Sequence, residues 1–261
     1  MPYVERAGAP TVYYEIDDHT DPWKNAPYLL LYHGLGRNTR FWYNWVPYLS
    51  RHYRVLRMDM RGFGRSRQRF DPAQGFRFAD LVDEVVAVID AVGAQSVHFC
   101  GEHFGGTLGF QLAAEHPQRV RTLSLMSAQV YLQANIQKDF AMGEASWVDA
   151  LRKHGIRKWT AQTNASKRFP PQTDPGFLDW YCDELAKTDL ETLISFSQLC
   201  SAYNLTEYLP RIGAPVLAFY PRTRPDQVAL MRKHVKRVDI VTLDTDYSMF
   251  YCLRPRQCAQ A

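Results

Sequence analysis

Residues 96–106 read Ser-Val-His-Phe-Cys-Gly-Glu-His-Phe-Gly-Gly, and two local patterns meet in them. The first half is a short apolar run, which is typical of a strand buried on both faces. Just beyond it, Leu108, Leu112 and Ala113 recur at helical spacing. The three glycines allow the two backbones to approach closely around a tight turn. The segment therefore predicts a strand, a turn centred on His103, and a helix.

The same alternation continues along most of the chain. Short apolar runs predict further strands at 28–32, 53–58, 121–126, 215–220 and 238–243. Helical spacing extends from Phe78 to about Gly93. Strands that alternate with helices predict an α/β fold whose central sheet is mostly parallel. Because ligands of such sheets bind outside the carboxyl ends of the strands, the loops that follow the strands are expected to meet at one site.

The middle of the chain contains no strand pattern. Residues 129–209 carry aromatic and aliphatic side chains at the spacing of short helices, interrupted by Pro170-Pro171 and Pro175-Gly176. We expect this segment to form a helical cap, or lid, over the strand ends. Residues 1–128 and 210–261 then form the two parts of the α/β core.

Composition excludes several classes of protein. The 261 residues are 46% hydrophobic and 22% charged, with a net charge of +4, which is ordinary for one globular domain. No long block of like charge indicates nucleic-acid binding. Arg222 and Arg224 are expected mainly on solvated surface, with binding of an anionic substrate as the alternative. Five cysteines without a CxxC pair argue against a disulfide framework or a zinc site.

A cytoplasmic location is the expectation from the apolar segments. The run at 28–32 is far too short to cross a membrane, and the first residues lack a signal-peptide pattern. We therefore expect a small-molecule substrate as partner, with no membrane and no nucleic acid. Nothing in the sequence indicates an oligomeric state.

Three motifs in register resemble the α/β-hydrolase family. They are the turn around His103, the His33-Gly34 pair at the end of a strand, and the loop Asp59-x-Arg61-Gly62-x-Gly64-x-Ser66. The resemblance covers nearly the whole chain and is closest to small esterases, lactonases and carbon–carbon bond hydrolases. It implies the α/β-hydrolase fold with an inserted lid. It also implies an oxyanion hole made by two backbone N–H groups, here those of Leu35 and Phe104, each worth on the order of 3 kcal/mol in a transition state.

The catalytic positions differ from those of the family. His103 stands where the family has its nucleophilic serine, Ser248 where it has histidine, and Arg224 where it has the acid. Because serine and histidine have exchanged places, a hydrogen bond between the Ser248 hydroxyl and His103 is a possible remnant of the family's pair. We rank His103 as general base, nucleophile or polar anchor above Ser248 as nucleophile, since the oxyanion donors stay on the side of His103.

Other candidate residues lie near these positions. Asp246 and Asp226 are within two residues of the expected slots and are candidates to orient His103, although most such acids are solvated loop residues. His33, Arg37, Trp42, Glu102 and Arg224 are candidates to contact substrate. No HxH or HExxH spacing indicates a metal site, and no cofactor is implied.

Three functions fit the sequence. The first is a hydrolase-like enzyme acting on a small carbonyl compound, such as an ester, a lactone or a β-diketone, with His103 as base or nucleophile. The second is a cofactor-free, non-hydrolytic enzyme, such as a lyase, decarboxylase or dioxygenase. The third is a catalytically degenerate protein that binds a small molecule without turnover.

Overall fold

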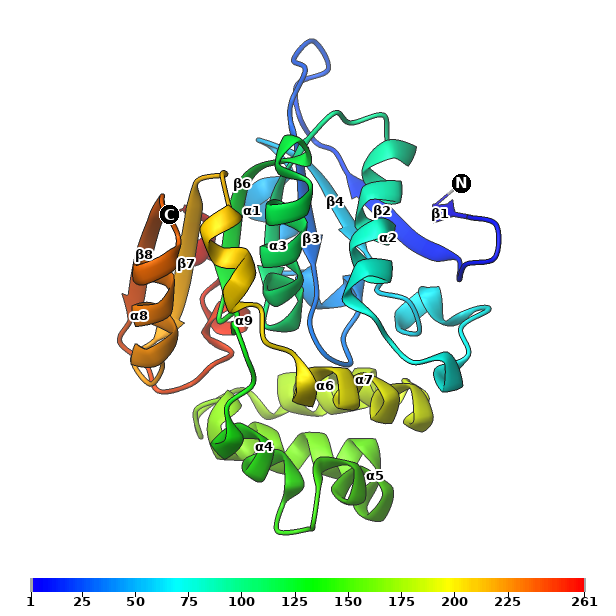
Figure 1. Ribbon diagram of the computed structural model, residues 1–261, viewed down its shortest axis with the longest axis vertical. Coiled ribbons are helices and arrows are strands. Elements are labelled where there is room, and N and C mark those ends of the chain that lie inside the picture. The colour runs from blue at the N-terminus through cyan, green and yellow to red at the C-terminus, as the bar shows by residue number, and fades with distance from the viewer. Residues whose placement is uncertain (1, 261) are drawn as a thin grey trace.

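A computed structural model describes residues 2–260, apart from the side chain of residue 167 (Figure 1). One sheet of eight strands runs through the molecule, in the order β1-β2-β4-β3-β5-β6-β7-β8. The strands are β1 (Tyr3–Val4), β2 (Val12–Asp17), β3 (Tyr28–Tyr32), β4 (Arg54–Met58), β5 (Val97–Glu102), β6 (Val120–Met126), β7 (Val216–Pro221) and β8 (Val238–Leu243). The six strands from β3 to β8 are parallel to one another, as the alternation predicted.

The first two strands were not predicted. They are antiparallel and extend the sheet beyond β4, with Tyr14 opposite Met58. Strand β2 contains Glu15 and Asp17 and is only partly buried, so it lacks the continuous apolar run of the central strands. Strand β2 pairs with β4, a segment far from it in the sequence. Local sequence patterns do not predict such long-range pairing.

Strand order reverses next to β3. The chain passes from β3 to β4 on one side and then crosses back to β5 on the other. At this switch point the loops that leave Tyr32 and Glu102 diverge and leave a crevice between them. The crevice is the place where a ligand of an open α/β sheet is expected.

A single residue connects β5 to α3 (Phe104–Glu115). His103 has φ 46° and ψ −117°, a strained conformation for a side chain with a Cβ. A Cβ on Gly105 would lie 2.3 Å from the Tyr32 carbonyl oxygen, and one on Gly101 would lie 2.5 Å from the Gly105 backbone. The turn therefore needs glycine on both sides of His103, and it lifts the imidazole above the strand ends.

The remaining helices cover the sheet. In Figure 1, α2, α3 and α8 lie in front of the sheet and α1 behind it. Their bounds are α1 (Val46–Leu49), α2 (Phe78–Ala91), α8 (Pro225–His234), α9 (Phe250–Leu253) and α10 (Pro255–Gln260). Short 3-10 helices are η1 (Thr39–Trp42), η2 (Gly64–Arg67), η3 (Pro72–Gln74), η4 (Pro117–Arg119) and η6 (Thr206–Arg211).

Four helices between β6 and β7 lie across the carboxyl ends of the strands, at the bottom of Figure 1. They are α4 (Ala134–Ala141), α5 (Trp147–Thr163), α6 (Pro175–Ala186) and α7 (Leu190–Ala202), with the π-helical turn η5 (Asn164–Arg168) after α5. This is the segment expected as a lid. A β-bridge between Tyr131 and Asn204, and a hydrogen bond from Leu205 N–H to the Val130 carbonyl, join its two ends. The helices are thus inserted as one unit into the α/β core.

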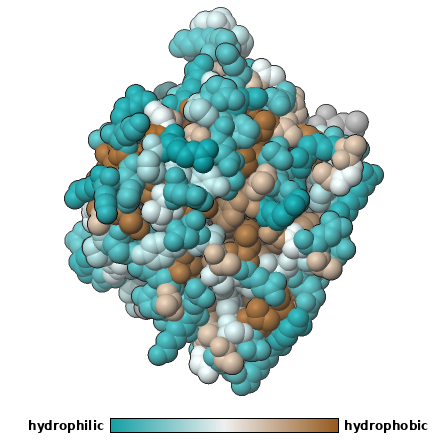
Figure 2. Space-filling view, viewed as in Figure 1, coloured by the Kyte–Doolittle hydropathy of each residue, from teal (hydrophilic) through white to brown (hydrophobic). Residues whose placement is uncertain are grey.

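Figure 2 shows a face that is mostly hydrophilic, with hydrophobic residues gathered in small patches near its centre. Within residues 2–260, no helix is both long and apolar enough to cross a membrane.

Candidate active site

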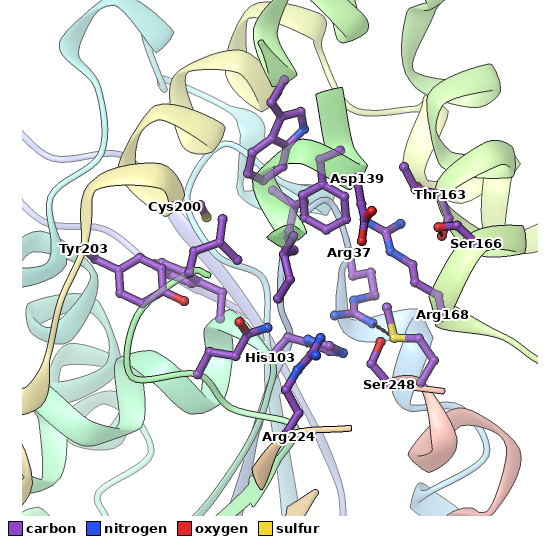
Figure 3. A pocket seen from close by; sticks show the side chains of 18 of the residues that line it. Arg37, His103, Asp139, Thr163, Ser166, Arg168, Cys200, Tyr203, Arg224 and Ser248 are labelled. Carbon is purple, nitrogen blue, oxygen red and sulfur yellow. Dashed lines mark hydrogen bonds between the residues drawn. The ribbon is translucent and has the colours of Figure 1, made fainter. Parts of the chain in front are cut away.

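A pocket lies between the strand ends and the lid, with His103 in its wall (Figure 3). Leu35 follows β3, His103 and Phe104 form the turn into α3, and Ser248 precedes α9. Arg168 and Tyr181 come from the lid. The pocket therefore combines the switch point of the sheet with the inserted helices.

The His103 imidazole is neutral at physiological pH. Its pKa is held well below 6.5, first by burial and then by the positive charges of Arg37, Arg168 and Arg224. The Ser248 carbonyl opposes this effect by accepting a hydrogen bond from the ring. The Nε2 atom is buried and has no hydrogen-bond partner among the described residues. The ring therefore has one nitrogen without a partner, and His103 lines the pocket.

Ser248 contributes its backbone, not its hydroxyl, to His103. The Ser248 carbonyl accepts a hydrogen bond of 2.9 Å from the Ser127 hydroxyl at the end of β6. In the described structure, no hydrogen bond joins the Ser248 hydroxyl to His103, although Ser248 does line the pocket. The expected hydrogen bond between the exchanged side chains is therefore not formed.

Neither candidate aspartate orients His103. Asp246 receives two hydrogen bonds from Arg222, at 2.7 and 2.8 Å, on the exposed surface. Asp226 accepts hydrogen bonds from Gln133 Nε2 at 2.5 Å and from Gln227 Nε2 at 2.8 Å. Both carboxylates are thus occupied by hydrogen bonds to side chains other than His103. The expectation that one of them orients the imidazole is corrected.

Two backbone N–H groups of pocket-lining residues lack an acceptor within the described structure. They belong to Leu35 and Phe104, both of which line the pocket. Within the described residues, neither N–H donates to a protein acceptor. The Phe104 N–H is the first of α3, where an intrahelical acceptor does not exist.

A buried ion pair supports the loop that carries Leu35. Arg37 contacts the Glu102 carboxylate and donates to the Tyr251 hydroxyl at 2.6 Å. Glu102 also accepts from the Gly34 N–H at 2.5 Å and from the Tyr251 hydroxyl at 2.6 Å. Burial raises the pKa of Glu102, and these three donors oppose that rise. Glu102 thus serves as an internal support below the pocket and does not line it, contrary to its expected contact with substrate, whereas Arg37 does line it.

His33 and Trp42 are also removed from the pocket. His33 bonds to the Gly34 carbonyl through Nδ1 at 2.9 Å and accepts the Met60 N–H at Nε2, also at 2.9 Å. Burial lowers its pKa to about 3. Trp42 is 2% exposed and packs edge-on against Trp45 in the core. Neither side chain lines the pocket, contrary to the expected contacts with substrate. The His33 ring joins the loops at the strand ends, and Trp42 is part of the core.

Arg168 is a pocket residue that sequence analysis missed. It lies in η5, is 7% exposed, and stacks over Phe140 and Trp159. Arg224, a candidate to contact substrate, is partly buried and lines the same pocket, so it is not on solvated surface as its composition alone favoured. No motif marks Arg168, since the lid has no strict pattern. In the described side chains, no group of three or more His, Cys, Asp or Glu residues is placed to hold a metal ion.

The parallel sheet, the turn at His103 and the inserted helices are those of the α/β-hydrolase fold. A sequence profile described as the alpha/beta hydrolase fold matches residues 27–197 of the chain. The chain belongs to the α/β-hydrolase fold family, as the three motifs predicted.

Curated relatives carry hydrolase names. A RutD protein of Yersinia enterocolitica, whose name proposes carbamate hydrolysis, is 33% identical over 145 residues, which are 56% of this chain and 49% of that protein. The 2-hydroxymuconate semialdehyde hydrolase of Pseudomonas sp. CF600 is 38% identical over 104 residues, or 38% of this chain and 36% of that one. The aligned part spans about half the length of such relatives, or less.

Solved structures share the fold over the full length. The enol-lactonase of Burkholderia xenovorans LB400 has a TM-score of 0.85 at 24% identity and covers 99% of this chain and 97% of its own. A hydrolase of Pseudomonas aeruginosa PA01 has a TM-score of 0.83 at 24% identity, with 99% and 95% covered. At this identity the likeness concerns the fold.

Proposed function

We propose that the protein hydrolyses a small carbonyl compound, an ester or lactone, with neutral His103 as general base. The observation that carries this proposal is the unpaired Nε2 of His103 beside the unpaired N–H groups of Leu35 and Phe104. A base and two oxyanion donors on one side of a pocket are what acyl transfer to water requires. The hydrolase names of the curated relatives support the same class of reaction.

The reaction follows from this arrangement. We infer that the ring nitrogen bonded to the Ser248 carbonyl is Nδ1, because Nε2 has no partner, so Nε2 carries the lone pair. A water molecule bound at Nε2 attacks the carbonyl carbon and gives its proton to Nε2. The carbonyl oxygen becomes an oxyanion that accepts hydrogen bonds from the Leu35 and Phe104 N–H groups. Collapse breaks the acyl–oxygen bond, and the imidazolium returns the proton to the leaving alcohol.

A panel of small esters and lactones tests the proposal. His103→Ala is expected to lower kcat/KM by about 10²- to 10⁴-fold, the usual size of a general-base contribution. His52→Ala, which removes an exposed histidine outside the pocket, is the matched control and should leave the rate unchanged. An equal rate in His103→Ala and in the wild type contradicts the proposal.

A non-catalytic binding protein is the second candidate. It is favoured by one observation: the two candidate carboxylates, Asp226 and Asp246, are bonded to other side chains and not to His103. A protein of this kind would be stabilised by a carbonyl ligand and would show no turnover on the panel. Turnover that depends on His103 decides against it.

A further inference from the structure

Positively charged side chains gather at the pocket. Arg37, Arg168 and Arg224 all line it. The Glu102 carboxylate pairs with Arg37 from behind, Asp139 lies on the pocket wall, and Asp226 lies within electrostatic reach of Arg224.

Two of these arginines have no ion-pair partner in the described part of the chain. Arg168 makes one long hydrogen bond, 3.4 Å to the Asn164 side chain, and its guanidinium otherwise faces aromatic rings. Arg224 bonds at 3.4 Å to the carbonyl of the neighbouring Thr223. By contrast, Arg222, two residues earlier, is bonded to Asp244 and Asp246 on the surface. Burying a cation without a partner costs free energy. Two arginines in one pocket that both lack an ion-pair partner therefore indicate an anionic ligand.

The arginines and the reactive groups share one space. Figure 3 shows Arg37, Arg168 and Arg224 pointing into the cavity that also contains His103. All three lower the pKa of His103, which places their charges within electrostatic reach of the ring. Arg224 occupies the slot where the family has an acid. A cation at this position cannot orient imidazolium, but it can bind the substrate.

We propose that the substrate is a carbonyl compound with a carboxylate group, and that Arg168 and Arg224 bind this carboxylate. A planar carboxylate matches the guanidinium fork, and neither Arg168 nor Arg224 has an ion-pair partner within the described residues that would compete for it. The apolar wall of Leu132, Ile136 and Trp147 suits the hydrocarbon part of such a molecule. This inference rests on the proposed function only for the identity of the reacting group.

Carboxylate binding also assists the base. The three guanidinium groups disfavour protonated His103, and the pocket contains Asp139 as the opposing charge on α4, with Glu102 and Tyr251 behind Arg37. A bound carboxylate offsets part of the positive field. The substrate thus raises the proton affinity of the imidazole at the moment when a proton must be accepted.

Binding can be measured without catalysis by using ketones, which have a carbonyl group but cannot be hydrolysed. Straight-chain oxo acids from 4-oxopentanoate to 7-oxooctanoate, and the matching amides, are titrated by calorimetry into the wild type and into Arg168→Met, Arg224→Met and Arg222→Met. At least one acid should bind the wild type at least tenfold more tightly than its amide. Arg168→Met and Arg224→Met should each abolish this preference, whereas Arg222→Met, the matched surface control, should keep it.

Other outcomes overturn the inference. These are equal affinity for acid and amide in the wild type, no binding of any member of the series, or an unchanged preference in both pocket variants. Because Arg168 packs against aromatic rings, Arg168→Lys is included as a variant that keeps the charge, and it should retain part of the preference. His103→Ala should bind the acid within about threefold of the wild type, so a failure of the proposed catalysis is distinguished from a failure of carboxylate recognition.

Discussion

The Ser127 hydroxyl donates a hydrogen bond of 2.9 Å to the Ser248 carbonyl, and that carbonyl is the one that faces the His103 ring. Ser127 has φ 54° at the end of β6, so the strand end is bent to present its side chain to the loop before α9. The contact of Ser248 with the His103 ring is therefore made by a backbone carbonyl and not by a side chain. This relationship makes a specific prediction about Ser248.

Ser248→Ala should leave kcat/KM within about threefold of the wild type, because the backbone carbonyl persists and the hydroxyl bonds to nothing in the described structure. The rates are measured on the ester and lactone panel. A loss of more than about 100-fold would show that the Ser248 hydroxyl is the nucleophile, and His103 would then be its base.

The pH profile should reflect a neutral imidazole. His103 accepts a proton only when it is neutral, and its pKa lies well below 6.5 because of burial and the three arginines. On a neutral ester, kcat/KM is thus expected to stay level from about pH 8 down to pH 6.5 and to fall only as pH drops further through the lowered pKa. A midpoint at or above 6.5, with circular dichroism unchanged, contradicts the assigned environment of His103.

His33 makes stability depend on pH. Its pKa of about 3 in the folded protein compares with 6.5 for an unperturbed histidine. Between these values the unfolded chain binds one proton more than the folded chain, so stability falls as pH falls, by about 1.4 kcal/mol per pH unit from this residue. His33→Gln should remove that part of the slope in urea unfolding between about pH 6 and pH 4. His52→Gln, an exposed control, should keep the slope.

The pair Arg37–Glu102 should show strong coupling. Glu102→Gln leaves the buried Arg37 without its carboxylate and should cost about 3–5 kcal/mol of unfolding free energy. The double variant Arg37→Met with Glu102→Gln should cost less than the sum of the single changes, because no uncompensated charge remains. Additive costs in urea unfolding would show that the two charges do not interact as the geometry indicates.

Gly105→Ala tests the close approach at the turn. An alanine inside a helix normally stabilises it, by up to about 1 kcal/mol relative to glycine. Here the new Cβ would lie 2.3 Å from the Tyr32 carbonyl oxygen, so a loss of about 1–3 kcal/mol is expected instead. Gly213→Ala, whose Cβ meets nothing within 4 Å, should be neutral or slightly stabilising. Equal effects of the two changes would contradict the packing at the turn.

The parallel strands, the turn at His103 and the family could be predicted from the chain alone. Local patterns suffice for these, since apolar runs, helical spacing and the glycines around His103 act over a few residues. The antiparallel strand β2 was not predicted, because its burial depends on pairing with β4, which lies far along the chain.

The partners of the side chains within the site could not be predicted, because they depend on how distant segments pack together. Asp226 and Asp246 stood at plausible positions in the chain, but side chains from other segments, Gln133 and Arg222, took their carboxylates. Arg168 entered the pocket through the packing of a lid that has no motif. The charge around His103 is a sum over residues distant in sequence, so it exists only once the fold has brought those residues together.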